Sequence, residues 1–426
     1  MRKLTNYIRN RKSFVVFSVL KILILVLSLV TNIFIVRKLS INEYGIFSVA
    51  LMLIGVFTTF GFNWSSSSII YYGSKEKTKS GRINKTFWAR NIIILTSLVI
   101  TTILFVFFRL QINEYIGLNV AFLILIWLYV SVIEDYLSQY FLAVKKQILS
   151  SMLSVTAKVI YIVLLIIFDF EVKSLILLNI ISHSTVILYV LGINKKDVGK
   201  FEFDKDWFKE VLNFSLWQLF GFSGLYLINF GDTAVIKHFM TTEDVGIYNA
   251  AYKLFNAIAS FAYVISSYYA SSVSQYFTNR ESQKIRQFYY KDRILILGIS
   301  LFAHISVMIF SKSIIVMLYG ERYAKSAIIF NVLMVGSLFR YLTVFYMLYF
   351  NTNGKHKLQQ YINIARAMLN IVLDIVFIQF FGIIGPAIAT TIAIILTAVF
   401  PVVYCEKKIR EITIIDHSAK NGDATK

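Results

Sequence analysis

Residues 13–36 read SFVVFSVLKILILVLSLVTNIFIV, an apolar run that contains one charged residue, Lys21. About 20 apolar residues are enough for a helix to cross the hydrocarbon core of a membrane. A cleavable signal has a shorter apolar region, of about 7–15 residues, and ends in a small-residue cleavage site. This run is longer and leads into Arg37 and Lys38. It therefore predicts a retained first transmembrane helix that begins on the cytoplasmic side.

Similar runs recur along the whole chain. Hydrophobic residues make up 57% of the 426 positions and charged residues 15%, whereas soluble domains have about 45–50% and 25%. This composition excludes a soluble enzyme, a disordered protein and a nucleic-acid-binding module. The predicted architecture has about twelve transmembrane helices, near 13–36, 45–70, 91–108, 116–143, 149–168, 172–193, 211–236, 246–274, 294–318, 326–350, 361–381 and 383–404.

The basic residues predict how the chain is oriented. With both termini inside, the inside segments hold 30 of the 43 lysines and arginines, and the outside loops hold 8. Cytoplasmic loops of membrane proteins are enriched in these residues. An even number of spans with both termini cytoplasmic is therefore predicted. The same asymmetry accounts for the net charge of +20 without a nucleic-acid partner.

An internal repeat relates the two halves. Residues 35–47 and 235–248 share, in order, a basic loop, an acid, a glycine and an aromatic residue, with one insertion. Because the repeat unit has six helices, an even number, the halves share one orientation. The predicted fold is an all-α polytopic membrane protein of two six-helix bundles, related by a pseudo-twofold axis along the membrane normal, with a site between them. The predicted domains are an N-terminal bundle (1–193), a cytoplasmic linker (194–210), a C-terminal bundle (211–404) and a cytoplasmic tail (405–426).

Charges within these helices are the candidate functional residues, because a charge at the bilayer centre costs about 2.5–3.5 kcal/mol on insertion scales. In the eleventh helix the spacing places Asn363, Arg366, Asn370 and Asp374 on one face. The candidates for substrate binding or coupling are Lys21, Lys158, Asp232, Lys253, Arg366, Asn370 and Asp374.

Each of these charges also has a structural interpretation. Lys21, Lys253 and Arg366 could reach a membrane surface through their long side chains, whereas Lys158, near the middle of its helix, could do so only with strain. Asp232, which aligns with Asn32 in the repeat, could lie at the outer edge. When Arg340 and the pair Glu134–Asp135 are also counted, the cationic and acidic residues within the predicted helices nearly balance, five against four. An anionic pyrophosphate group would favour the lysines and arginines.

Signs of enzymatic chemistry are absent from the sequence. No phosphate-binding G-x-x-x-x-G-K-[ST] motif occurs, the five histidines are scattered, and Cys405 is the only cysteine. We therefore expect no enzyme activity, no metal site and no resident cofactor.

Four segments carry a resemblance to a known family: 36–47, 230–254, 318–323 and 381–389. They resemble polysaccharide repeat-unit flippases of the Wzx type, in the multidrug/oligosaccharidyl-lipid/polysaccharide exporter superfamily. The resemblance covers nearly the whole chain in architecture, and its motifs are loose. It implies two six-helix bundles arranged in a V that work by alternating access.

The same resemblance implies a cargo and a setting. The cargo would be an undecaprenyl-pyrophosphate-linked oligosaccharide, moved to the outer leaflet of the bacterial cytoplasmic membrane for O-antigen, capsule or exopolysaccharide synthesis. A proton or sodium gradient would drive transport. Membrane lipids, a polysaccharide polymerase and a chain-length regulator are the expected partners.

Other functions remain open from the sequence. A drug/cation antiporter of the same superfamily would need the helix acids to dominate, and a lipid II flippase would often have extra helices. A major-facilitator carrier would show a basic Gly/Asp/Arg loop, which residues 72–90 lack. A membrane-embedded polymerase or ligase would usually have a long outer loop.

Overall fold

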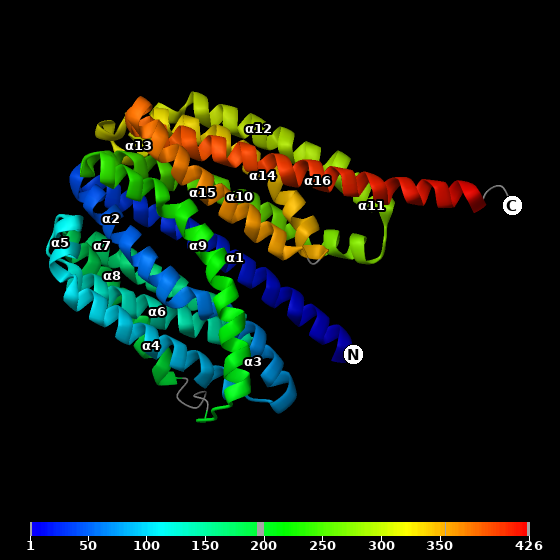
Figure 1. The fold of residues 1–426 in the computed structure, drawn as a ribbon, viewed down its shortest axis with the longest axis horizontal. Coiled ribbons are helices and arrows are strands. Elements are labelled where there is room, and N and C mark those ends of the chain that lie inside the picture. Colours follow the sequence, from blue (N-terminus) through cyan, green and yellow to red (C-terminus); the bar gives the residue numbers. More distant parts are fainter. Residues whose placement is uncertain (1, 194–199, 354, 424–426) are drawn as a thin grey trace. The chain divides into compact units, whose positions relative to one another are not determined.

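The computed structural model describes residues 2–193, 200–353 and 355–423, and these residues form helices joined by short turns (Figure 1). The chain divides into two compact units, 1–226 and 227–426. This division falls within α9 (Lys205–Phe239), whereas the sequence predicts a linker at 194–210. Residues 194–199 of that linker lie outside the described part, and 205–210 begin α9. The predicted domain assignment stays a prediction.

The first unit consists of helices of spanning length and shorter helical turns. Its elements before α9 are α1 (Arg2–Lys38), α2 (Ile41–Phe57), η1 (Thr58–Phe62), η2 (Asn63–Ser65), α3 (Ser66–Ser80), α4 (Lys85–Phe107), α5 (Arg109–Ile116), α6 (Ala121–Ala143), α7 (Gln147–Ile167) and α8 (Val172–Ile193).

The second unit begins within α9 and repeats this pattern. Its further elements are α10 (Thr242–Thr278), α11 (Ser282–Gln287), η4 (Phe288–Asp292), α12 (Arg293–Ile309), α13 (Ser311–Tyr319), η5 (Glu321–Tyr323), α14 (Ser326–Thr352), α15 (His356–Phe381), η6 (Gly382–Ile384) and α16 (Gly385–Asp423).

The predicted spans are helical in the structure. Among the described residues, ten stretches are long and apolar enough to cross a membrane. One of them, 357–411, contains both α15 and α16, and α10 is not among the ten. These two points account for the difference from the twelve predicted spans. The prediction of an all-helical, multi-span membrane protein is confirmed.

The second predicted helix is interrupted rather than continuous. Between α2 and α3 the backbone passes through a π turn, η1, and a 3₁₀ turn, η2. The hydroxyls of Ser65, Ser66 and Ser68 each donate to the carbonyl three residues earlier, at 2.6–2.9 Å. Such side-chain bonds compete with regular helix geometry, so the serine run accompanies the interruption.

The boundary between α15 and α16 depends on two glycines. Gly382 has φ +56°, in the left-handed region that favours glycine, and it ends α15. Gly385 begins α16 and is followed by Pro386, a residue suited to the first turn of a helix. The predicted break at 380–384 is therefore present, and it separates two helices that composition alone would merge.

The internal repeat corresponds to a repeated local structure. Ser40 caps α2, and its hydroxyl accepts from the Glu43 amide while the Glu43 carboxylate accepts from the Ser40 backbone N–H. Thr241 and Asp244 form the same reciprocal capping box at α10. The acid that recurs in the two repeat segments is therefore a helix-capping residue in both units.

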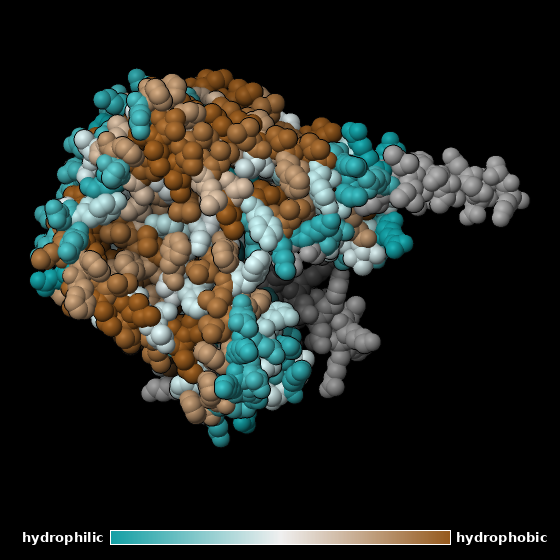
Figure 2. Space-filling view, viewed as in Figure 1, coloured by the Kyte–Doolittle hydropathy of each residue, from teal (hydrophilic) through white to brown (hydrophobic). Residues whose placement is uncertain are grey.

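Apolar side chains cover much of the molecular surface in the view of Figure 2. Phe107, Phe302 and Phe380 are each at least 75% exposed. A soluble monomer rarely exposes large apolar patches. This surface is the kind that contacts lipid chains.

Candidate functional site

Three of the candidate residues meet in the second unit. Asn370 Nδ2 donates to Asp232 Oδ1 over 2.8 Å and to Asp374 Oδ2 over 2.7 Å. Asp232, Asn370 and Asp374 are only 3%, 4% and 0% exposed. Asp232 comes from α9, and the other two come from successive turns of α15. The polar face predicted for the eleventh helix (α15) therefore packs against the seventh helix (α9). We use the name acid cluster for these three residues together with Tyr248 and Thr390.

Tyr248 and Thr390, the two residues that complete the acid cluster, were not among the predicted candidates. The hydroxyl of Tyr248, on α10, donates to Asp232 Oδ2, and Thr390 Oγ1, on α16, donates to the same oxygen over 2.8 Å. Tyr248 lies in the repeated segment 235–248, which was a usable signal. Thr390 gave none, because threonines in apolar helices are common in this chain.

The chemistry of the acid cluster favours a bound cation. Two buried carboxylates lie within hydrogen-bonding distance of one amide nitrogen, and Asp374 Oδ1 is buried with no hydrogen-bond partner. Like charges in a buried site are costly unless a proton or a metal ion neutralises them. The nearby carboxylate and hydroxyl oxygens are the ligand type that hard cations prefer.

Within the described ranges, no group of three or more His, Cys, Asp or Glu residues could hold a metal ion. The acid cluster has two acids and three neutral polar residues, so it suits a proton or a weakly bound, exchangeable cation.

Arg366 lies on the same face of α15 but does not join the acid cluster. Its Nε donates to Thr397 Oγ1, on α16, over 2.8 Å, and the residue is 8% exposed. A side chain that extended to the membrane surface would be more exposed, so the guanidinium is held inside the second unit.

The three candidate lysines are not among the hydrogen-bonded residues of the acid cluster, although Lys253 lies on the same helix as Tyr248. Lys253, on α10, is partly buried, with its Nζ 5.7 Å from the Phe230 ring centre. Lys21 is exposed on α1, with its Nζ 5.4 Å from the Phe17 ring. Lys158, on α7, is partly buried and interacts electrostatically with Glu134.

The first unit holds its own partly buried polar group around Glu134. Ser154 Oγ, on α7, donates to Glu134 Oε1 over 2.9 Å, and His183, on α8, makes a short hydrogen bond to Oε2. The neighbouring Asp135 lies 3.8 Å from Arg90 Nη2. Arg90 is itself only 1% exposed, and it lies near the start of α4, in a stretch (85–107) that is long and apolar enough to cross a membrane.

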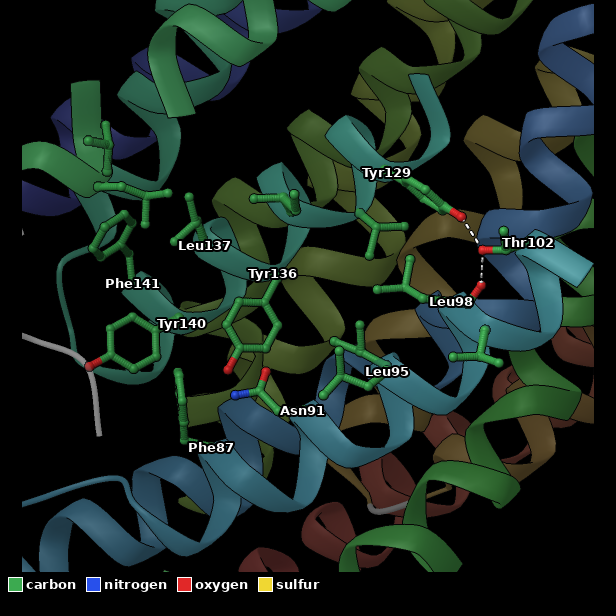
Figure 3. Close-up of a pocket in the computed structure, with 16 residues that line it drawn as sticks. Phe87, Asn91, Leu95, Leu98, Thr102, Tyr129, Tyr136, Leu137, Tyr140 and Phe141 are labelled. Carbon is green, nitrogen blue, oxygen red and sulfur yellow. Dashed lines mark hydrogen bonds between the residues drawn. The ribbon is translucent and has the colours of Figure 1, made fainter. Parts of the chain in front are cut away.

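A cavity of about 510 Å³ lies in the first unit between α4, α6 and the end of α8 (Figure 3). Leu95, Leu98 and Leu137 are among its lining residues, and Thr102 and Tyr129 hydrogen-bond to each other at its wall. The lining is almost entirely apolar. It suits a hydrocarbon chain and offers few hydrogen-bonding groups to a sugar.

These features define a class of protein: a multi-span helical membrane protein with charged groups buried inside its helices. A family model described as "Polysaccharide biosynthesis protein" matches residues 11–269, and a second, "MatE", matches residues 219–376. The first match covers more than half of the chain, and the chain therefore belongs to the polysaccharide biosynthesis protein family.

Known relatives agree with this assignment. The chain is 22% identical, over 84% of its length and 76% of the relative's, to the Haloferax volcanii protein named "Probable low-salt glycan biosynthesis flippase Agl15". The fold of the present chain is similar to that of lipid II flippase MurJ in an inward closed conformation. The TM-score is 0.76 at 16% identity, and the match covers 94% of this chain and 90% of MurJ.

A multidrug transporter has a similar fold. An inward-facing transporter of the multidrug resistance MATE family, in the MOP superfamily, matches with TM-score 0.67, 15% identity, and 91% and 94% of the two chains covered. The predicted membership of this superfamily is confirmed. The chain is a multi-pass membrane protein of a transporter and flippase family, not an enzyme.

Proposed function

We propose that this protein is a flippase for lipid-linked oligosaccharides. It moves undecaprenyl-pyrophosphate-linked repeat units from the inner to the outer leaflet of the bacterial cytoplasmic membrane, for O-antigen, capsule or exopolysaccharide synthesis. The match of residues 11–269 to the polysaccharide biosynthesis family carries the proposal. The name of the Haloferax relative, a glycan biosynthesis flippase, supports the same class of cargo.

Charge in the membrane supports an anionic headgroup. Arg366 is buried and bonded to a neutral threonine, and the guanidinium geometry suits the oxygens of a pyrophosphate. A drug/cation antiporter is the second candidate. The acid cluster is compatible with either function, because both can be driven by a cation gradient.

The acid cluster is the proposed coupling site. A proton or a sodium ion bound between Asp232 and Asp374 would neutralise one buried charge and satisfy Asp374 Oδ1. Binding and release of that cation would then favour different conformations of the transporter. We also propose that both termini are cytoplasmic. A polysaccharide polymerase and a chain-length regulator are proposed to act on the exported units.

Deletion of the gene in its native host tests the cargo. We expect the loss of surface polysaccharide and an accumulation of short lipid-linked oligosaccharides, which mass spectrometry of the lipid extract would detect. Arg366→Ala should fail to restore the polysaccharide, and Arg366→Lys should restore part of it, because lysine lacks the bidentate fork. Immunoblotting controls for membrane levels.

The alternative predicts a different result. Unchanged polysaccharide together with new sensitivity to cationic drugs would reject the flippase and support the antiporter. Full restoration by Arg366→Ala at a normal protein level would remove Arg366 from the transport mechanism.

A further inference from the structure

Two buried arginines in the second unit have no carboxylate partner. Arg340, on α14, and Arg366, on α15, are each 8% exposed. Among the described residues, no salt bridge joins either one to an acid. Arg340 lies over the Phe255 ring, 4.9 Å from its centre, and its Nε has no hydrogen-bond partner. Positive charge is therefore concentrated here, and among the described residues no acidic side chain forms an ion pair with it.

The contacts between α14 and α16 place the two arginines at the same level. Thr391 donates to the Val332 carbonyl over 2.8 Å, and further along Cys405 Sγ lies 3.8 Å from the Tyr346 carbonyl. Residue numbers therefore rise together along this pair of helices. Arg340 lies between those two contacts, and so does Thr397, which holds Arg366.

Close helix packing supports this placement. A Cβ on Gly336 would lie 3.3 Å from the Thr391 backbone, so α14 and α16 approach closely one turn before Arg340. Arg340 and Arg366 also interact electrostatically with each other. Two like charges brought together in a buried position are costly, unless an anion binds between them.

We propose that Arg340 and Arg366 form an anion site for the pyrophosphate of the lipid carrier, and that a cation in the acid cluster strengthens it. This inference rests on the proposed flippase function and adds the residues that bind the headgroup. Paired guanidinium groups match phosphate oxygens in geometry and charge.

Two helices connect the anion site to the acid cluster. On α15, Arg366 and Asp374 are eight residues apart, which is about 12 Å along a helix. On α16, Thr390 of the acid cluster and Thr397 of the anion site are seven residues apart, about 10 Å. A change at one site therefore acts on the same two rigid elements as a change at the other.

A pair of tyrosines on α10 provides a third connection. Tyr248 donates to Asp232 and stacks on Tyr252, with ring centres 6.0 Å apart. Tyr252 interacts electrostatically with both Arg340 and Asp232. The tyrosines thus lie between the acidic and the basic groups.

The sign of the coupling follows from charge balance. Without a cation, the negative charge of the acid cluster partly compensates the two arginines across a medium of low dielectric constant. A bound cation removes that compensation, so the arginines favour an anion more strongly. By linkage, a bound pyrophosphate must strengthen cation binding by the same factor.

Binding of inorganic pyrophosphate to the purified full-length protein in phosphatidylcholine nanodiscs tests both claims. Titration calorimetry at one pH would compare sodium chloride with choline chloride. We expect pyrophosphate to bind at least about tenfold more tightly in sodium chloride than in choline chloride. A proton as the cation would instead give tighter binding at lower pH in choline.

Variants assign the residues. Arg340→Gln and Arg366→Gln should each abolish measurable pyrophosphate binding, and Arg366→Lys should retain part of it. Arg322→Gln, at an exposed arginine of η5, is the matched control and should bind like the wild type. Asp374→Asn should bind pyrophosphate with no dependence on sodium, and its binding should not become tighter at lower pH. Thermal melting shows whether each variant is folded.

Several outcomes would overturn the inference. Wild-type pyrophosphate binding by folded Arg340→Gln and Arg366→Gln proteins would reject the anion site. Equal affinity in sodium and in choline, with no tightening at lower pH, would reject the coupling. Loss of pyrophosphate binding in phosphatidylglycerol nanodiscs would mean that the phosphate of a bilayer lipid occupies the site. The headgroup of the lipid carrier would then not be its ligand.

A lipid-borne ligand separates this inference from the proposed function. Farnesyl pyrophosphate should compete with inorganic pyrophosphate for the wild type and not bind Arg366→Gln. If these results hold but gene deletion leaves surface polysaccharide intact, the anion site stands and the proposed cargo fails. If gene deletion removes the polysaccharide but substitution of either arginine leaves pyrophosphate binding unchanged, the flippase function is supported and the anion site is rejected.

Discussion

Asp232 and Asp374 share one hydrogen-bond donor, the side-chain amide of Asn370, at 2.8 Å and 2.7 Å. The two acids are far apart in sequence and lie on α9 and α15. Because both are buried, the arrangement keeps two negative groups together inside an apolar helical unit. The energetic cost of this arrangement is the strongest physical indication of a functional site in the molecule.

Removing one of these acids should remove a cation effect on stability. We expect sodium, or a lower pH within the range above about pH 5, to raise the melting temperature of the wild-type protein. The added free energy of unfolding would be up to about 2.7 kcal/mol when the cation is at a hundred times its Kd. Asp374→Asn should melt without that dependence and should not support transport. Glu321→Gln, at an exposed acid of η5, should behave as the wild type. A cation effect that survives in Asp374→Asn would contradict the assignment.

The two units allow a matched comparison of tyrosine hydrogen bonds. Tyr248 donates to the Asp232 carboxylate, and Tyr44 donates to the neutral Asn32 amide oxygen over 2.9 Å. Hydrogen bonds to charged groups contribute about 1.5–3 kcal/mol and neutral ones about 0.5–1.5 kcal/mol. Tyr248→Phe should therefore lower the free energy of unfolding more than Tyr44→Phe. Equal losses in denaturant titrations would indicate that the Asp232 carboxyl is protonated.

The sequence predicted the elements and one wall of the acid cluster. Apolar runs of spanning length set the helices, and the spacing of Arg366, Asn370 and Asp374 placed them on one face. That spacing could not reveal which helices pack against this face of α15, because the partner residues on α9, α10 and α16 are distant from it in the chain. Thr390 was missed for this reason, since a threonine in a membrane helix carries no pattern of its own. Tyr248 was missed although it lies in the repeated segment 235–248.

Breaks inside apolar runs were partly predictable. The α15–α16 boundary followed from Gly382, Gly385 and Pro386, whose backbone preferences are local. The interruption between α2 and α3 did not, because serines also bond back to the backbone within continuous helices of this chain, such as Ser28 in α1 and Ser215 in α9.

Glu76 stabilises the start of α4. Its carboxylate accepts backbone N–H groups of three successive residues, Asn84, Lys85 and Thr86, at 2.7–2.9 Å. First-turn amides have no partner within the helix, and a negative charge favours that end. We expect Glu76→Gln to cost about 1–3 kcal/mol in chemical unfolding. Glu114→Gln, at an exposed position of α5, should change stability by less than about 0.5 kcal/mol, and a similar loss in both variants would contradict this role.

Asp204 predicts a dependence of stability on pH. Lys85 donates to it over 2.7 Å, and this hydrogen bond lowers the pKa of the Asp204 carboxyl below its ordinary value. A lowered folded-state pKa adds stability above the unfolded value of about 3.9, and that stability is lost as the pH falls through the folded pKa. Acidification from about pH 5 to about pH 3 should therefore lower the melting temperature of the wild type more than that of Asp204→Asn. Equal shifts would show that the ion pair does not contribute.

Gly385 should not tolerate a side chain. A Cβ there would lie 2.4 Å from the Phe377 carbonyl oxygen and 2.6 Å from the Ile378 nitrogen. Both atoms belong to the backbone of α15, so the contact can be relieved only by moving one helix away from the other. Forced overpacking of this kind costs about 1–3 kcal/mol, and here it would also displace Thr390 from Asp232.

Gly298 is the control for that substitution. It lies in α12, and a Cβ there would meet nothing within 4 Å. Since alanine favours a helix interior over glycine by about 0.5–1 kcal/mol, Gly298→Ala should melt at the same temperature as the wild type or slightly higher. Gly385→Ala should melt lower and should also lose the cation-dependent rise in melting temperature, because the acid cluster needs α15 and α16 in register. A Gly385→Ala protein that keeps both its stability and its cation response would show that the corner between these helices can shift without disturbing the acid cluster.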